Sequence, residues 1–363
     1  MSSPTSPFWV ADQNTSESTL YMSNSALIPL VVKISCTVDG AVTTPCPYPA
    51  RGQFFEPLAG KTNLFGPTGI VWNALSTSGA FTIPGSSQPA TFIFATLDGL
   101  IVGWNTQVNR TQGVVVANRS ANGALYSGLA IAAPAVAPGE DLIQATFLYA
   151  TNSAPGGKID VFDSRFNLVS SFDADAKVPT GFEPYGIQAF GNKLYVTYFN
   201  PTGQGGILDV CDLTTNLMAP ACRRLYISPP LMAAPAAGYS ATTVTNPVLQ
   251  TTVLNGPWGM ALAPAGFGPL SNMLLVGNVN DGTIHAFDPD TGAFTGTLAL
   301  SAGKPFAAPG LWALQFGQGA AANGGRNQLF FTAGPAPASN PTLLFSEGIF
   351  GTIVPANARS GIK

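Results

Sequence analysis

A short pattern of strands and turns recurs along this chain, and its clearest copy spans residues 256–288. An apolar step at 256–262 is followed by an apolar run at 273–278 and, after the turn Asn280-Asp281-Gly282, by a third run at 283–288. Short apolar runs separated by Asn, Asp and Gly are typical of antiparallel strands joined as hairpins. The stretch therefore predicts three consecutive strands of one small sheet.

The same pattern occurs in six units of about 55 to 70 residues. Four-stranded antiparallel units of this size are typical of propeller blades, which close into a ring around a channel. The opening step lies at Gly69, Gly128, Gly186 and Gly259, with Ala313 in the last unit; the second strand lies at 8–12, 92–96, 147–151, 194–198, 274–278 and 329–332; the third lies at 100–104, 158–162, 206–211, 283–287 and, more loosely, 343–349.

We therefore predict an all-β fold, a six-bladed β-propeller of four-stranded antiparallel blades forming a single domain over residues 1–363. The glycine of the opening step fits an innermost strand, where neighbouring backbones converge and leave little room for a side chain. Long connections at 36–65 and 225–255 both lead into an innermost strand, which places them on one rim of the channel. The predicted blades span approximately 1–35, 66–120, 125–175, 183–228, 256–300 and 310–354.

The first blade begins at its second strand, so it is expected to lack its innermost strand. Two explanations are open: the natural chain begins earlier and has lost an export signal, or the segment 351–363 closes the ring. Residues 1–4 lead straight into strand-like sequence, so no signal peptide is expected in this sequence.

Low charge excludes several classes of partner. Charged residues make up 9% of the chain and the net charge is −3, which leaves no basic field for nucleic acid or anionic lipid. Gly, Pro, Asn and Thr interrupt every apolar run before it reaches the length of a membrane span. We expect a monomer without a membrane span or a nucleic-acid partner.

Four cysteines form two local pairs, Cys36 with Cys46 and Cys211 with Cys222. Their spacing does not match a zinc or redox motif, and no histidine lies nearby. We predict two short-loop disulfides, which indicate an oxidising compartment and a secreted or cell-surface protein. Glycosylation sequons, which agree with secretion, begin at Asn14, Asn109 and Asn118.

The amino-acid sequences of the strands resemble those of an uncharacterised family of secreted, NHL-like six-bladed propellers. The resemblance rests on runs such as Phe8-Trp9-Val10-Ala11-Asp12, Phe92-Ile93-Phe94-Ala95-Thr96 and Leu329-Phe330-Phe331-Thr332-Ala333. Some members of that family carry a bacterial surface-sorting tail. Members usually begin with a further strand and a Pro-Trp-Gly step, which this chain lacks. The resemblance implies no activity and no functional residue.

Most groups that could perform catalysis have a structural interpretation. His285, the only histidine, lies in a third strand, where other units place Val102, Val161 or Val210. Ser/His/Asp catalysis is not favoured, and no Gly-x-Ser-x-Gly elbow is present. Carboxylates at the ends of strands and in turns are expected to bond to their own turns; they are Asp98, Asp163, Asp212, Asp281 and Asp288.

The channel rim is the remaining candidate site. Tyr185, Trp258 and Trp312 each precede the innermost-strand glycine or its equivalent. Together with Asn152 and Asn278 they are the predicted ligand-binding residues, although the aromatic side chains could instead only plug the channel. Asp12, Asn152, Glu183 and Asn278 offer the oxygen ligands that Ca²⁺ prefers and could form a metal site, although asparagines at strand ends could instead only cap the strands or form turns.

Two functions follow from these alternatives, besides a scaffold that holds no small ligand. The first is a secreted or surface-associated binding module that holds a small molecule, glycan or protein at the channel rim. The alternative is a Ca²⁺-dependent lactonase or esterase with its ion at the channel.

Overall fold

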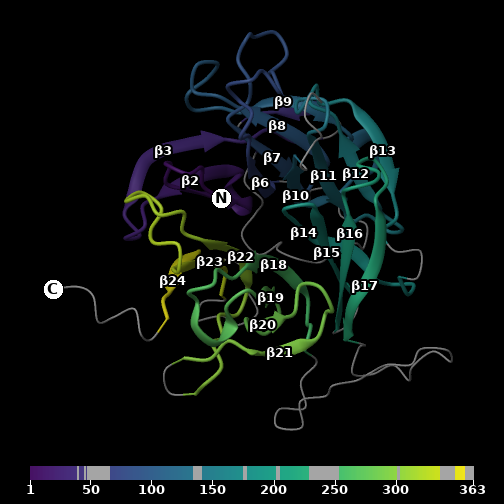
Figure 1. Ribbon diagram of the computed structural model, residues 1–363. Helices are drawn as coiled ribbons and strands as arrows, with labels where there is room; N and C mark the ends of the chain where they lie inside the picture. The colour runs from purple at the N-terminus through teal and green to yellow at the C-terminus, as the bar shows by residue number, and fades with distance from the viewer. Residues whose placement is uncertain are drawn as a thin grey trace.

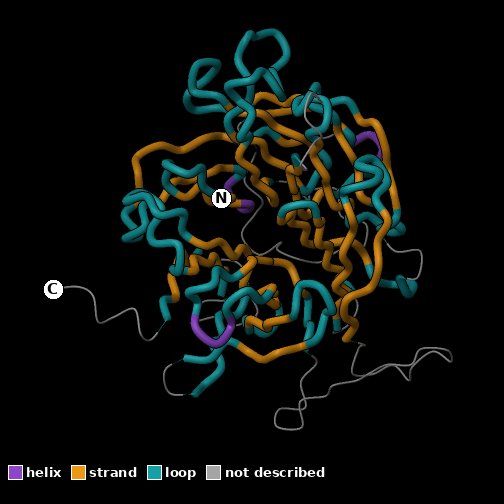
Figure 2. Tube along the Cα trace, in the orientation of Figure 1, coloured by secondary structure: helices purple, strands orange, loops and turns teal. Residues whose placement is uncertain are grey.

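A computed structural model describes residues 1–38, 41–44, 46, 66–133, 141–174, 178–201, 205–228, 253–300, 303–335 and 348–355. The chain is a six-bladed β-propeller of small antiparallel sheets arranged around a centre (Figure 1). In Figure 2 the described residues are strands joined by loops, with three short 3₁₀ turns and no α-helix among them. The predicted fold class is confirmed.

Four blades have four strands each, ordered from the centre outward as they occur in the chain. Their innermost strands β6, β10, β14 and β18 surround the centre, and β9, β13, β17 and β21 lie at the periphery (Figure 1). The strands are β6 (Pro67–Trp72), β7 (Phe92–Thr96), β8 (Leu100–Trp104) and β9 (Val114–Asn118) in blade 2; β10 (Tyr126–Ala132), β11 (Phe147–Asn152), β12 (Ile159–Phe162) and β13 (Leu168–Phe172) in blade 3; β14 (Glu183–Phe190), β15 (Lys193–Phe199), β16 (Gly206–Asp212) and β17 (Ala221–Ser228) in blade 4; β18 (Pro257–Leu262), β19 (Leu274–Asn278), β20 (Ile284–Phe287) and β21 (Phe294–Thr297) in blade 5.

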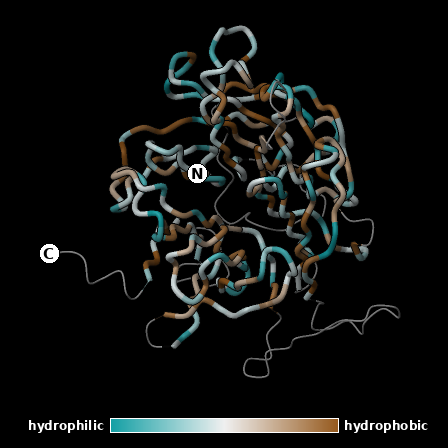
Figure 3. The backbone as a smooth tube through the Cα atoms, in the orientation of Figure 1, coloured by the Kyte–Doolittle hydropathy of each residue, from teal (hydrophilic) through white to brown (hydrophobic). Residues whose placement is uncertain are grey.

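The first blade has three strands, β1 (Phe8–Asp12), β2 (Glu17–Tyr21) and β3 (Leu27–Lys33), and no innermost strand among the described residues, as predicted. Met1 takes one position beside β1, where Met1 and Trp9 exchange backbone hydrogen bonds of 2.6 and 2.8 Å. The outer strand β3, at the upper left of Figure 3, is apolar, with Leu27 59% exposed.

The last blade also has three strands within the described residues: β22 (Leu311–Phe316), β23 (Leu329–Ala333) and β24 (Ile349–Ile353). The third strand therefore begins at the end of the predicted range 343–349, of which 343–347 lie outside the described residues. Because β24 pairs with β23, residues 349–353 belong to the last blade and do not supply an innermost strand to the first. Residues 356–363 lie outside the described residues.

The core is divided into five apolar clusters, one between each pair of consecutive blades from blade 1 to blade 6. Trp9 of blade 1, for example, packs on Phe92 of blade 2 with ring centroids 4.6 Å apart. The ring closes between blades 6 and 1, where Phe8 lies 4.3 Å from Phe330. The amide of Asn323 in blade 6 donates to the backbone oxygens of Ser3 and Pro4.

Both predicted disulfides are present. Cys211 and Cys222 lie directly opposite each other on β16 and β17, the two outer strands of blade 4. Cys36 and Cys46 close a small hairpin of β4 (Cys36–Val38) and β5 (Ala41–Thr43) at the start of the first long connection. Residues 47–65 of that connection lie outside the described residues. In the second, residues 225–228 belong to β17, and 229–252 are outside the description.

Candidate functional site

Each innermost strand enters the centre through the same irregularity. Its register against the second strand shifts in all five blades that have such a strand, at Pro67/Gly69, Tyr126/Gly128, Pro184/Ile187, Pro257/Met260 and Leu311/Leu314. A bulge of this kind inserts an extra residue and re-aims the neighbouring side chains. The bulged residues include the three aromatic positions predicted at the rim, so the bulge determines where those side chains lie.

Four aromatic side chains from three blades form one cluster at the bulges. Tyr185 stacks on Phe199 with ring centroids 4.2 Å apart and meets Trp312 edge-on at 6.0 Å. Trp258 meets Trp312 edge-on at 5.5 Å, with an interplanar angle of 87°. Edge-to-face and offset contacts of this kind are favourable and hold the rings in fixed orientations. We call Tyr185, Phe199, Trp258 and Trp312 the channel aromatic cluster.

The cluster is tied to blade 3 by one hydrogen bond. The indole Nε1 of Trp258 in blade 5 donates to the backbone oxygen of Ser127 in blade 3, at 2.9 Å. This bond joins two blades that are not neighbours in the ring and so fixes the position of the Trp258 side chain. The Ser127 hydroxyl in turn lies 2.8 Å from the backbone oxygen of Tyr185 and 3.2 Å from the Thr151 hydroxyl. The aromatic cluster thus rests on a hydrogen-bonded wall.

Exposure differs between the predicted aromatic residues. Tyr185 is only 6% exposed, and burial raises the pKa of its hydroxyl. Trp258 and Trp312 are half-buried. Tyr185 therefore supports the cluster from beneath, while the two tryptophans retain surface that a ligand could contact.

The two predicted asparagines act as braces at strand ends. The Oδ1 of Asn152 accepts a hydrogen bond from the backbone N–H of Leu125, which leads into β10. In the same way the Oδ1 of Asn278 accepts from the N–H of Asn255, which precedes β18, and its amide donates to the oxygen of Val253. Asn278 is fully buried. Both amide oxygens thus hold the chain as it enters an innermost strand.

Two carboxylates complete the predicted metal set, and each has a protein partner. Asp12 accepts a hydrogen bond of 2.6 Å from the Thr19 hydroxyl; burial raises its pKa to about 6, the nearby Glu17 adds to that effect and the Thr19 hydrogen bond opposes it. Glu183 accepts from the backbone N–H of Gly156 at 3.3 Å, and burial raises its pKa as well. Across the described part of the chain, no three His, Cys, Asp or Glu side chains gather in a way that could hold a metal ion.

His285 lies in β20 with both ring nitrogens close to hydroxyl groups, Nε2 2.8 Å from Thr283 and Nδ1 3.0 Å from Thr297. Burial lowers its pKa to about 4, an effect that nearby Asp281 partly opposes. The predicted equivalence with Val102, Val161 and Val210 is wrong by one residue. Since Val276 faces His285 as Val196 faces Asp209 and Ala150 faces Asp160, the true equivalents are Ile101, Asp160 and Asp209.

This third-strand position holds a buried polar group in three blades, a feature that the sequence analysis missed. Each of these groups bonds to the residue opposite it on the outer strand: Asp160 to Ser171, Asp209 to Arg224 and His285 to Thr297. Because buried polar groups require partners, these cross-strand pairs join the outer strand to its blade.

The turn carboxylates behave as predicted: the Oδ1 atoms of Asp163, Asp212, Asp281 and Asp288 accept backbone N–H groups of their own turns.

Asp98 has a further contact that its Asp-Gly turn did not indicate. Its carboxylate accepts the backbone N–H of Thr37 and so joins the disulfide-closed hairpin to blade 2. Asp98 is 8% exposed, and burial raises its pKa.

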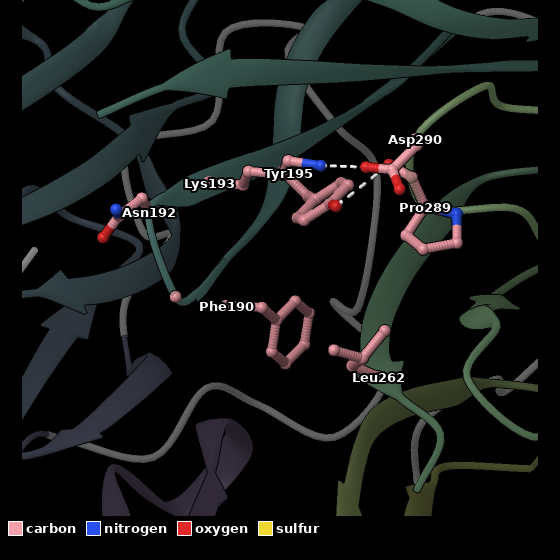
Figure 4. A pocket seen from close by; sticks show the side chains of 8 residues that line it. Phe190, Asn192, Lys193, Tyr195, Leu262, Pro289 and Asp290 are labelled. Atoms are coloured by element: carbon pink, nitrogen blue, oxygen red, sulfur yellow. Dashed lines mark hydrogen bonds and ion pairs between the residues drawn. The ribbon is translucent and has the colours of Figure 1, made fainter. Parts of the chain in front are cut away.

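A cavity of about 410 Å³ lies between blades 4 and 5 at the far end of β14 from Tyr185 (Figure 4). Phe190 and Leu262 line one side. On the other side Lys193 forms an ion pair with Asp290, and the Tyr195 hydroxyl donates to the oxygen of Pro289. These polar contacts join the two blades. Because the polar groups of the cavity are engaged with each other in this way, the channel aromatic cluster is the stronger candidate site.

Two of the three predicted glycosylation sites lie on the surface. Asn109 and Asn118 are exposed in blade 2. Asn14 lies in a 3₁₀ turn, Gln13–Thr15, and its side chain is outside the description. Among the described residues no helix is long and apolar enough to cross a membrane.

The fold and the site define a six-bladed β-propeller with two disulfides and an aromatic channel. The sequence matches no family model. It is similar to uncharacterised proteins of Acanthamoeba polyphaga mimivirus. R640 is 29% identical over 63% of this chain and 38% of its own length, and R648 is 28% identical over 74% of this chain and 59% of its own. The chain thus spans between about two fifths and three fifths of the length of these relatives.

Solved structures with similar backbones include a nidogen/laminin complex, with a TM-score of 0.45 and 10% identity over 96% of this chain and 94% of that one. An auxiliary nutrient binding protein from Bacteroides thetaiotaomicron gives a TM-score of 0.46 and 10% identity over 90% of this chain and 66% of that one. Of the expected resemblance, the six-bladed propeller fold and the uncharacterised relatives are found, and membership of a secreted, NHL-like family stays a prediction. A bacterial export signal and sorting tail stay predictions.

Proposed function

We propose that this propeller is a binding module that takes a ligand with a flat apolar face, such as a sugar ring, on Trp258 and Trp312. The observation that carries the proposal is the edge-to-face pair of these two rings, which come from neighbouring blades and remain half-buried. Binding sites are commonly lined by aromatic side chains with a few fixed polar groups. The channel aromatic cluster supplies the aromatic lining, and the buried hydroxyls of Ser127 and Thr151, both bonded to the backbone oxygen of Tyr185, hold that lining in place.

Preorganisation is the physical reason to favour binding. Trp258 is fixed by its hydrogen bond to Ser127, and Trp312 is held between Trp258 and Tyr185. A ligand that stacks on such rings loses little affinity to the ordering of side chains. A low content of charged residues, 9%, favours neutral ligands over ionic ones.

The two disulfides indicate an oxidising environment. We extend this to a secreted or surface-associated protein that acts as a monomer. Its ligand would then be an extracellular small molecule, a glycan or an exposed side chain of another protein.

The calcium-dependent hydrolase has less support. An ion held by Asn152 and Asn278 would compete with the backbone N–H groups that their oxygens accept. No contact of the described residues favours that alternative over the binding module.

A glycan array tests the proposal. The wild-type protein, labelled at its exposed lysines, should bind a restricted set of neutral glycans, and the Trp312→Ala variant should lose those signals. Trp72→Phe is the matched control, because Trp72 is also a half-buried tryptophan on an innermost strand but lies at the other end of β6. Signals that persist in Trp312→Ala would place binding elsewhere and contradict the proposal.

A further inference from the structure

We propose that Asn109 and Asn118 are a pair of N-glycosylation sites whose glycans cover the outer edge of strand β9. The two sequons bracket this strand, one in the loop before Val114 and the other at its last residue. This inference does not depend on the channel or its ligand.

The two sequons have the same local geometry. The Oδ1 of Asn109 accepts the backbone N–H of Thr111 at 3.0 Å, and the Thr111 hydroxyl lies 3.5 Å away. The Oδ1 of Asn118 accepts the N–H of Ser120 at 3.0 Å and its hydroxyl at 2.6 Å. In each sequon the side-chain oxygen is engaged by the hydroxyl residue two positions on, as in an Asx turn.

This geometry leaves the reactive atom accessible. A glycan is attached to the amide nitrogen Nδ2, and both asparagines are exposed. Among the described residues, neither Nδ2 donates a hydrogen bond to a protein acceptor. Each hydroxyl group that a sequon requires is already beside its asparagine.

The strand between the sequons needs protection. β9 pairs with β8 on one side. Its other edge faces outward beyond residues 111–113, which exchange backbone hydrogen bonds with Lys33 of blade 1. Unprotected edge strands are templates for association between chains, and natural proteins protect them with charges, proline, irregularities or a cover. β9 begins with the uninterrupted apolar run Val114-Val115-Val116-Ala117.

The apolar run of every other outermost strand is interrupted, by charges or proline in two blades and by serine, threonine or glycine in three. β3 contains Pro29 and Lys33, β17 contains Arg223 and Arg224, and β13, β21 and β24 each contain serine, threonine or glycine. β9 has none of these residues before its final Asn118, although an irregularity at Val116 interrupts its pairing with β8. A five-residue strand is roughly 17 Å long, so one branched glycan at each end can cover it.

The test for modification uses the full chain, exported through a eukaryotic secretory pathway. Peptide mapping after release by peptide-N-glycosidase F should find Asn converted to Asp at both positions. Thr111→Val and Ser120→Ala should each remove one glycan, and Thr111→Ser should retain it. Unmodified Asn109 and Asn118 in the secreted protein would overturn the proposal.

The test for the covering role compares association in solution. Native enzymatic deglycosylation and the double variant Asn109→Gln/Asn118→Gln should both self-associate at concentrations where the glycosylated protein elutes as a monomer. Asn24→Gln is the matched control, because Asn24 is an exposed asparagine in a similar turn outside any sequon. Equal elution of the glycosylated and deglycosylated forms would overturn the role of the glycans. Glycan-array binding by the channel should change in neither case, which separates this test from that of the proposed function.

Discussion

A β-carbon on Gly186 would lie 2.1 Å from the carbonyl oxygen of Trp258, the residue before the equivalent glycine of the next blade. The same relationship links Gly259 to the carbonyl oxygen of Trp312, again at 2.1 Å. Neither glycine has a positive φ, so close approach of two backbones, not backbone conformation, requires the missing side chain. The two glycines thus set the positions of the two tryptophans.

Gly186→Ala and Gly259→Ala should each lower the free energy of unfolding by about 3 kcal/mol, the range expected when an added methyl group must push neighbouring strands apart. Urea unfolding monitored by circular dichroism measures this loss. Gly325→Ala is the control, since a β-carbon there would meet nothing within 4 Å and its φ is not positive. Equal stability of the Gly186 and Gly325 variants would refute the close contact.

His285 should make the protein less stable in mild acid. Its pKa falls from 6.5 to about 4 on folding, so between these pH values the unfolded chain binds the proton more readily than the folded protein. The free energy of unfolding therefore decreases as the pH falls through this window, by up to about 3 kcal/mol from this group. In His285→Ile, which copies Ile101 of blade 2, this component should disappear. Urea titrations at pH 7.5 and 4.5 check it, and identical losses in both proteins would show that His285 titrates normally.

Asp12 should have the opposite pH dependence. Burial raises its pKa from 3.8 to about 6, so the folded protein binds this proton more readily and gains stability as the pH falls from 6 to 4. Asp12→Asn keeps an acceptor for Thr19 and removes the buried charge. We expect it to be more stable than wild type by about 2 kcal/mol at pH 7.5 and by much less at pH 4. If Asp12 were instead a calcium ligand, the variant would be less stable at pH 7.5, and wild-type protein treated with EDTA would lose stability that Ca²⁺ restores.

The two disulfides should contribute unequally to the ring. Cys211 and Cys222 join facing strands inside blade 4, so Cys211→Ser/Cys222→Ser should lower the free energy of unfolding by about 3 kcal/mol, as expected for a short closed loop. The Cys36–Cys46 bond closes a hairpin outside the blades, and Cys36→Ser/Cys46→Ser should cost less than half as much. Thermal unfolding of both variants tests the order, and the reverse order would contradict it.

The fold was predictable because a propeller repeats its turn chemistry. Gly at 69, 128, 186 and 259 marked the innermost strands, and the strand pattern identified six units. The register of individual strands was harder to predict from the sequence. His285 was aligned with Val210, whereas its equivalent is Asp209, because the third strands do not all begin at the same register and a one-residue shift exchanges the two faces of a strand.

The candidate site was predictable only in part. The order of residues in the repeat placed Tyr185, Trp258 and Trp312 at equivalent points of three blades. It did not reveal how far each side chain is exposed to solvent. Tyr185 is buried because Phe199 and Trp312 pack against it. Phe199 ends the neighbouring strand β15, and Trp312 belongs to another blade, so the sequence around Tyr185 shows neither contact. Asn152 and Asn278 looked like metal ligands from their residue type, and only the structure reveals the backbone N–H groups that they brace.

The most direct test of the aromatic channel is a titration of tryptophan fluorescence with a panel of neutral oligosaccharides, namely the hexamers of cellulose, chitin and mannan. We predict that at least one hexamer changes the emission of the wild-type protein saturably, and that Trp312→Ala binds it at least tenfold more weakly, a loss of about 1.4 kcal/mol. Trp72→Phe should bind as wild type does. The absence of a saturable change with every hexamer, or equal affinity in Trp312→Ala, would contradict the proposal that the channel holds a sugar on its tryptophans.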